Sequence, residues 1–340
     1  MNTIKDIAKK ANVSVTTVSN VIHSNYAHVS QETVDKIKSI IEESHYVPNM
    51  SARSLVNNSS RIIGVINHLI PSQQESFLQD PFHTASIGGI EKELSDSGYF
   101  LMLRTVSNAN DLFSLMKNWS LDGLIFVGLF RDAFYQMLMD LRIPVVLIDS
   151  YIDDDSILSV GLEDKKGAYL ATKYLLEKGH RKIAFASPKI RAGGVLSQRL
   201  EGYKQALREA GVRFERRSVL ESEMTIEASM DLGRRIAAQP DFTAVFATAD
   251  SLAAGILAGL REAGRRVPED VSVVGFDDLS LSLLTTPRLT TIHQDAVEKG
   301  RIAAHMMIGH LKGTEGMEKK VVLPVRLVER ESVCPPFAGK

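Results

Sequence analysis

The sequence predicts a small all-α bundle at the amino end, followed by an α/β core of two doubly wound subdomains. Two observations support this fold class. The first 60 or so residues hold no strand-like run, whereas from Arg61 onward Val/Ile/Leu/Phe runs alternate with helical stretches. The chain has 340 residues with 44% hydrophobic and 24% charged residues, which is the composition of a globular protein too long for one ordinary core.

Three short helices are expected in the amino-terminal part. Each follows a hydroxyl residue that can cap its first turn, namely Thr3, Ser14 and Ser30, and Asp6 can complete a capping box with Thr3. The first helix is expected from Ile4 to Ala11. Apolar residues recur at helical spacing and give each helix one buried face: Ile4, Ile7, Ala8 and Ala11; Val15, Val18, Val21 and Ile22; Val34, Ile37, Ile40 and Ile41. Asn12-Val13 interrupts the first pattern, and Tyr46, Val47 and Pro48 end the third.

The outer face of the second helix carries small hydroxyl and amide side chains instead of the Glu, Lys and Arg of an ordinary solvated helix. A helix, a tight turn and a second short helix, backed by a third, form a helix-turn-helix, whose second helix enters the DNA major groove. We expect base contacts from Val15, Thr16 and Asn20. Thr17 and Ser19 suit phosphate oxygens. The alternative is a purely structural three-helix bundle.

The charge of this part is only mildly positive. Residues 1–61 contain seven basic and five acidic residues, so the net charge is 7 − 5 = +2. One copy should therefore bind DNA weakly, and two copies on a two-fold-symmetric site are expected. The segment 49–60, which is rich in Asn and Ser, is weakly helical and should order on contact with a partner.

Beyond this linker, nine strand-like runs are expected, and the break between two sets of roughly five βα units falls near Gly161. The runs are IIGVIN, YFLMLRT, DGLIFVG, IPVVLIDS, SILSVGL, RKIAFAS, RRSVLES, FTAVFAT and VSVVGFD. The acidic loop Asp153–Asp155 follows the fourth run and is expected to be solvated.

Two amino-terminal segments, TIKDIAKKANVSVTTVSNVI and YVPNMSARSLVNNSSRIIGVI, resemble the lactose-repressor (LacI/GalR) family of bacterial transcription regulators. GHRKIAF, RLEGYKQAL, VSVVGFDD and PRLTTIHQD resemble its regulatory core, which is similar to periplasmic sugar-binding proteins. The resemblance implies a hinge helix in the minor groove, with Leu55 driven between base pairs. Asn49, Ser51, Ala52 and Arg53 would then meet the groove floor or the DNA backbone.

The resemblance also implies a division of the chain into domains. It comprises a DNA-binding domain (1–47), a hinge (48–60), an N-terminal regulatory subdomain (61–161 and 291–318), a C-terminal regulatory subdomain (162–290 and 319–333) and a tail (334–340). The two subdomains would close on a small molecule in the cleft between them.

The family pattern implies an effector site. Arg199 and Asp277 are the expected contacts from the C-terminal subdomain, and Asp149 is the matching position in the N-terminal one. Arg and Asp together suit the recognition of polyols. Phe82 can supply an apolar wall. The chain departs from the pattern at Ala249-Asp250, where many relatives have Asn-Asp, so the usual amide donor is missing.

Two further residues of the expected cleft have ordinary explanations. Asp250 begins a predicted helix and is read as its cap ahead of a direct ligand. His68 follows the first strand, and a lone histidine in such a loop is expected to be solvated, although it can also line the cleft. The identity of the effector, its sign, the operator sequence and the need for a protein co-repressor are not readable from these residues.

The expected function is a sequence-specific transcriptional repressor that binds a palindromic operator in double-stranded DNA as a homodimer. A small effector, of the carbohydrate class or a related metabolite, would control it. No heptad tail follows the last core residues, so we expect a dimer and not a tetramer.

Other function classes fit less well. No cofactor, metal site or enzymatic activity is expected, because nucleophile-elbow, Walker, dinucleotide-binding and zinc motifs are missing and the histidines lack ligand spacing. The single cysteine, Cys334, excludes a disulfide within the chain. No signal peptide or membrane span is recognisable, so a cytoplasmic location is expected. The rivals are a solute-binding protein, which would need a signal peptide, and a sugar-processing α/β enzyme, which would need a catalytic constellation.

Overall fold

The computed structural model describes residues 3–22, 25–46, 59–68, 77–106, 108–141 and 143–337, and the chain divides into two compact units, Met1–Ser60 and Arg61–Lys340. The predicted hinge contacts lie outside the described residues: Asn49, Ser51, Ala52, Arg53 and Leu55.

The first unit contains three helices, α1 (Ile4–Ala11), α2 (Val15–Ile22) and α3 (Gln31–Glu43). The expected caps are present. The Asp6 carboxylate accepts a hydrogen bond from the Thr3 amide at 2.8 Å, and the hydroxyl of Ser14 accepts from the Thr17 amide at 3.0 Å. Ser30 likewise accepts from the Thr33 amide at 3.3 Å.

The apolar faces of these helices form one small core, in which Ile7, Val18 and Ile37 are fully buried. Asn12 ends α1 in the left-handed region, with φ 56°, and so turns the chain into α2. α3 ends at Glu43, before the expected Tyr46–Pro48, because Ser44 caps it and Tyr46 instead packs against the core.

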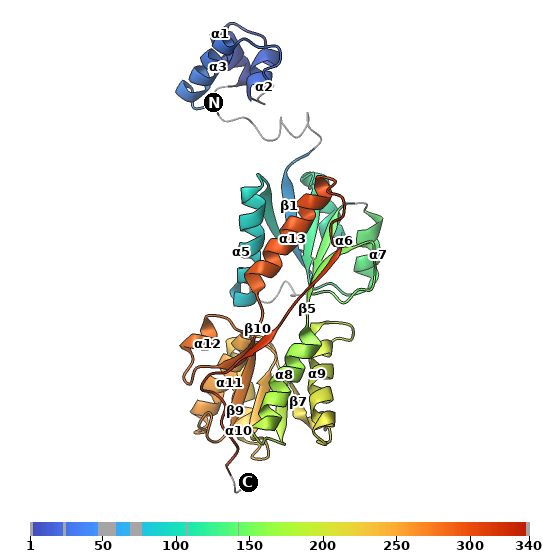
Figure 1. Ribbon diagram of the computed structural model, residues 1–340, viewed down its shortest axis with the longest axis vertical. Coiled ribbons are helices and arrows are strands. Elements are labelled where there is room, and N and C mark those ends of the chain that lie inside the picture. The colour runs from blue at the N-terminus through green and yellow to red at the C-terminus, as the bar shows by residue number, and fades with distance from the viewer. Residues whose placement is uncertain are drawn as a thin grey trace. The chain divides into compact units, whose positions relative to one another are not determined.

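The second unit holds two subdomains, each built on a six-stranded sheet (Figure 1). The sheet of the first subdomain is parallel and runs in the order β11-β5-β4-β3-β1-β2. Its strands are β1 (Ile62–Asn67), β2 (Phe100–Thr105), β3 (Gly123–Val127), β4 (Val145–Ile148), β5 (Leu158–Leu162) and β11 (Lys320–Leu323). Helices α5 (Pro81–Asp96) and α13 (Ala296–Leu311) belong to one apolar cluster, and α6 (Ala109–Asn118) and α7 (Ala133–Asp140) to another. A short 3-10 helix, Phe77–Gln79, precedes α5.

The sheet of the second subdomain runs in the order β12-β10-β9-β8-β6-β7, with β12 antiparallel to β10. Its strands are β6 (Ile183–Ser187), β7 (Val219–Glu221), β8 (Ala244–Ala247), β9 (Ser272–Asp277), β10 (Thr290–His293) and β12 (Arg326–Val328). Its helices are α8 (Asp164–Glu177), α9 (Val195–Glu209), α10 (Ile226–Ala237), α11 (Asp250–Glu262) and α12 (Leu281–Leu284), with a 3-10 turn at Arg216–Ser218.

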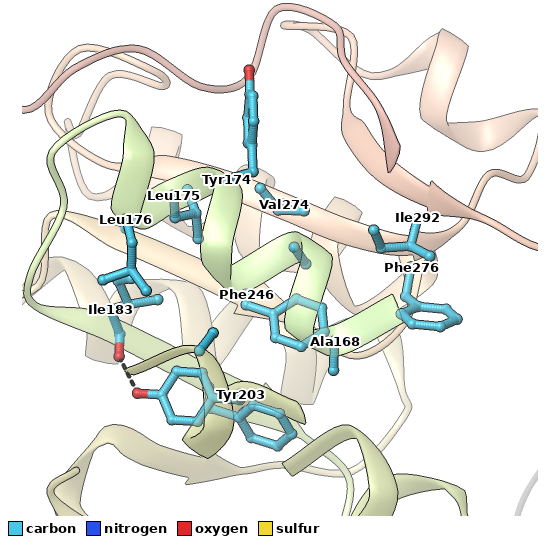
Figure 2. Packing of buried hydrophobic residues seen from close by; sticks show 14 of the residues in the cluster. Ala168, Tyr174, Leu175, Leu176, Ile183, Tyr203, Phe246, Val274, Phe276 and Ile292 are labelled. Atoms are coloured by element: carbon cyan, nitrogen blue, oxygen red, sulfur yellow. Dashed lines mark hydrogen bonds between the residues drawn. The ribbon is translucent and has the colours of Figure 1, made fainter. Parts of the chain in front are cut away.

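Both sheets are covered on both faces, which explains why their strands read as continuous apolar runs. On the α8/α9 side of the second sheet, Phe246 and Tyr203 pack with residues of α8 (Figure 2). The Tyr203 hydroxyl donates to the Ile183 carbonyl at 2.8 Å, so this phenol is buried with its hydrogen bond satisfied (Figure 2).

The sheets correct the expected domain boundaries at three places. Residues 291–293 were expected in the first subdomain but lie in β10 of the second sheet, whereas 320–323 were expected in the second and form β11 of the first. β5 also stays in the first sheet to Leu162, which pairs with Leu323 of β11. The sequence of a strand of only four residues does not indicate which sheet the strand joins, so its sheet is known only from the observed strand pairing. Among the described residues, no helix is long and apolar enough to cross a membrane.

Candidate functional sites: the α2 face and the inter-subdomain cleft

The outer face of α2 is uncharged. Val18 and Val21 point into the bundle, while Val15 remains 40% exposed at the start of the helix and Thr16 is exposed beside it. Ser19 and Asn20 are half-buried on the following turn. These positions leave a shallow row of short side chains along one side of the helix.

Thr17 has a second role that the sequence reasoning missed. Its hydroxyl lies 2.8 Å from that of Ser14, and its amide donates to the same Ser14 oxygen. Thr17 therefore takes part in the cap of α2, and a phosphate contact from it remains a prediction.

The predicted effector residues lie at strand ends and helix starts of the second unit. Asp149 directly follows β4 and Asp277 ends β9, and both have left-handed backbone angles, with φ 53° and 120°. Phe82 lies in the first turn of α5, where the Asp80 carboxylate accepts from its amide at 2.9 Å. Arg199 lies in α9 and is only 6% exposed.

A lysine and a glutamine that sequence reasoning missed connect three of these residues. The ammonium of Lys299 in α13 lies 2.7 Å and 2.9 Å from the two carboxylate oxygens of Asp149 and 5.1 Å from the centre of the Phe82 ring. It also donates to the side-chain carbonyl of Gln294 at 2.7 Å, and the amide of Gln294 donates to Asp277 at 2.6 Å.

Arg199 is held by its own set of partners. Its guanidinium contacts Asp164 at 2.8 Å, lies 3.5 Å from the centre of the Phe276 ring and donates to the Thr248 carbonyl at 2.5 Å. Asp164 in turn accepts from the Tyr151 hydroxyl at 2.6 Å. The expected polyol-binding groups are thus engaged with groups of the chain itself.

Burial changes the acidity of the carboxyl groups at this edge. It raises the pKa of Asp277 to about 7, an effect that the nearby Arg199 partly offsets. Burial also raises the pKa of Asp164 and, more strongly, that of Asp250, which has Asp277 as a like-charged neighbour. These carboxyl groups hold protons at pH values where exposed aspartates have lost theirs.

Asp250 does not cap α11 as expected. It is the first residue of the helix, after the cap position Ala249, and is fully buried. Its carboxylate accepts from the Thr291 hydroxyl at 2.6 Å and from the Leu279 amide at 2.9 Å, so it joins β10 to the loop after β9.

His68 is not simply solvated. It is half-buried, its ring stacks on Phe134 with centroids 3.8 Å apart, and its Nδ1 lies 3.2 Å from the Val106 carbonyl. The acidic loop agrees better with expectation, because Asp153 and Asp155 are exposed, with Lys320 as their ion-pair partner.

The two subdomains also meet through one arginine. Arg191 of the second subdomain lies 4.1 Å from the centre of the Phe130 ring and 3.9 Å from the Asp132 carboxylate of the first. A depression of about 440 Å³ lies beside α8 and α9 and includes Tyr151 and Asp164, but none of the four predicted effector residues lines it. Within the described ranges, no group of acidic, histidine or cysteine side chains could hold a metal ion.

A buried lysine among the apolar residues of α13 was the available signal for this network. Lys299 precedes Gly300, Ala303 and Met307 on the buried side of the helix, where a charge needs a partner. The identity of that partner, 150 residues away in the chain, required the tertiary structure.

Comparisons with known proteins agree with the observed architecture. Residues 3–49 match the model described as "Bacterial regulatory proteins, lacI family", and residues 172–333 match a "Periplasmic binding protein-like domain". The HTH-type transcriptional repressor PurR of Escherichia coli O139:H28 is 34% identical over 350 residues, covering 99% of this chain and 98% of that protein.

Two solved structures extend this likeness to three dimensions. The complex of the transcriptional regulator CelR with cellobiose has a TM-score of 0.73 at 29% identity, covering 98% of this chain and 100% of the other. The Lac repressor dimer bound to operator and the anti-inducer ONPF has a TM-score of 0.83 at 24% identity, covering 98% and 99%, and shows the shared fold.

Proposed function

We propose that this chain, which belongs to the lacI family of bacterial regulatory proteins, binds a palindromic operator as a homodimer. The premise is that it is a DNA-binding transcriptional repressor, as its family is. Each subunit places α2 in the major groove of one half-site. The two hinges, residues 48–60, order together in the central minor groove. We assign the protein to the cytoplasm, where its operator lies, and give it no catalytic role.

The outer face of α2 is the single observation that carries this proposal. Val15 is exposed at the start of a helix whose outer side chains are short and uncharged, so DNA bases can approach its backbone closely. Asn20 can bond bidentately to adenine, Thr16 can donate or accept, and Val15 can contact a thymine methyl group.

The test is selection of bound DNA from a random pool by the wild type and by a Thr16→Ala/Asn20→Ala variant. A change in the selected half-site is expected, whereas Lys5→Ala should mainly reduce the salt dependence of binding. Identical selected sequences from the wild type and the double variant would remove these two residues from base recognition. Failure of the wild type to select any palindrome would refute the function.

Leu55 is proposed as the minor-groove wedge of the hinge. Leu55→Ala should weaken binding to the operator by at least tenfold, because the kink would lose the side chain that separates the bases. Operator affinity is measured by fluorescence anisotropy, and circular dichroism checks that the core remains folded. Unchanged affinity would argue against the wedge.

Homodimer formation is supported by apolar side chains that the second subdomain leaves in solvent. Leu283 and Leu284 of α12 are 53% and 79% exposed, and Ile226 at the start of α10 is also exposed. Exposed apolar side chains that lie together mark protein–protein contact sites, and Leu283 and Leu284 are neighbours on one short helix.

The proposed effector is a small metabolite of the carbohydrate class that binds between the subdomains near Phe82, Asp149, Arg199 and Asp277. The CelR relative, bound to cellobiose, supports this class. Binding would alter the relation between the first subdomains of the dimer and so bias hinge pairing. Repeating the DNA selection with a metabolite library gives both the effector and the sign of its effect.

A further inference from the structure

Lys299 is a charged side chain with no exposure to solvent. It lies in the first turn of α13, and its relative accessibility is 0%. Burying an ammonium group costs free energy unless the group is paired and fully hydrogen-bonded. Its partners therefore indicate what this lysine does.

The three donors of the Lys299 ammonium group have three acceptors. Two are the carboxylate oxygens of Asp149, at 2.7 Å and 2.9 Å, and the third is the side-chain carbonyl of Gln294, at 2.7 Å. The Phe82 ring lies 5.1 Å from the same nitrogen, within the range of a cation–π contact. Two of the predicted effector residues thus already surround a cation of the chain itself.

These contacts cross between the subdomains. Asp149 follows β4, and α13 packs on α5 and on strands of the first sheet. Gln294 follows β10, and its backbone amide donates to the Asp277 carbonyl in the second sheet at 3.3 Å. Its side-chain amide donates to the Asp277 carboxyl group at 2.6 Å. A continuous path of hydrogen bonds, Asp149–Lys299–Gln294–Asp277, therefore joins the two sheets.

We infer that Lys299 is a built-in ligand, which occupies the position between Phe82, Asp149 and Gln294 and holds the two subdomains together. The inference rests on the proposed function only where it identifies this cleft as the effector site. It makes Lys299 a determinant of specificity, because both oxygens of Asp149 already bind its ammonium group and a sugar hydroxyl would have to compete with it.

Hydrogen–deuterium exchange of the full-length protein, without DNA or small molecules, tests the link. Lys299→Met keeps the length of the side chain and removes its charge. We expect amide exchange to rise more than tenfold in two segments on opposite sides of the cleft, 145–151 and 275–279. The control is Lys312→Met, the same substitution at the exposed C-cap residue that follows α13, which should leave both segments unchanged. If amide exchange in 275–279 is unchanged in Lys299→Met, Lys299 forms only a local ion pair within the first subdomain, and the inference is wrong.

Gln294→Leu separates the link from the ion pair, because it removes the bridge to Asp277 and leaves Asp149 and Lys299 together. If the path acts as one unit, Gln294→Leu should reproduce the loss of protection, and the double variant should lose no more than either single variant. Additive losses would overturn the inference. If Lys299→Met does not fold, Gln294→Leu tests the inference by itself. Amide exchange in 145–151 equal to that of the wild type would then overturn the inference. Because no DNA is present, the result stays distinct from a failure of operator binding.

Discussion

Aspartates with left-handed backbone angles terminate strands on both sides of the cleft. Non-glycine residues rarely adopt positive φ, yet Asp149 and Asp277 do so directly at strand ends. Asp278, with φ 60°, continues the turn and pairs with Arg330 and with His293 at 2.9 Å. Such conformations persist where surrounding contacts hold them, and here the ion pairs and hydrogen bonds of the cleft do so.

Asp277 should make the stability of the core depend on pH. Because burial raises its pKa from 3.8 to about 7, the folded state keeps a proton between pH 4 and 7 that the unfolded state releases. The free energy of unfolding should therefore fall as pH rises through this window, by up to about 1.4 kcal/mol per pH unit from this group.

Asp277→Asn should flatten that decline, which urea unfolding at pH 4.5, 5.5, 6.5 and 7.5 can measure. Asp270→Asn is the control. Hydrogen bonds from Arg266 lower the pKa of Asp270 to about 2, so it titrates below the window. A slope identical in the wild type and Asp277→Asn would contradict the assignment.

Close helix crossings fix the first subdomain at the scale of its elements. α5 and α13 approach so closely that a Cβ added at Gly89 would lie 2.0 Å from the Val297 carbonyl oxygen, and one added at Gly300 would lie 1.9 Å from that of Ser86. Since α13 also carries Lys299, this crossing fixes the position of the helix from which its ammonium group reaches Asp149.

Two adjacent glycines of α5 should respond to alanine with opposite signs. Gly89→Ala forces the helices apart and should destabilise the core by about 2 kcal/mol or more, as overpacking does. At Gly88 no described atom lies within 4 Å of the added Cβ, so alanine should stabilise the helix by about 0.5–1 kcal/mol. Thermal unfolding of both variants measures the difference. Destabilisation by Gly88→Ala would show that Gly88 also lies in the contact between the two helices.

At the scale of the whole molecule, repression couples two copies of the chain to one operator. Residues 1–61, which include the DNA-binding helices, have a net charge of only +2. One copy therefore gains affinity when a partner holds a second copy over the adjacent half-site. The assembly of the cores should therefore decide operator affinity as much as the α2 contacts do.

Leu284→Glu should disrupt the proposed homodimer, because it places a charge in an apolar contact face while the side chain, 79% exposed, contributes little to the fold. Sedimentation velocity should show monomers, and operator affinity should fall by at least tenfold. Phe337→Glu, an equally exposed site near the C-terminus, should leave the assembly intact. A dimeric Leu284→Glu protein would move the interface elsewhere.

The three-helix bundle, its caps and the doubly wound core could be predicted from the amino-acid sequence. Helical spacing with cap residues, and buried apolar runs between helices, are local patterns, so Thr3, Ser14 and Ser30 cap as predicted and all nine predicted strand runs contain strands. The family and its fold were also readable, because each segment that carries the resemblance is a continuous run of residues and needs no knowledge of the packing.

The sheets that β10 and β11 join, and the partners of the predicted effector residues, became known only from the three-dimensional structure. Asp250 looked like a helix cap because the sequence shows its own helix but not Thr291 or the Leu279 amide. Lys299 could be recognised as a charge on the buried side of its helix, but the sequence does not show that Asp149 and Gln294 are its partners. Burial and pairing across 150 residues depend on how layers pack, and that information is not local to any stretch of the chain.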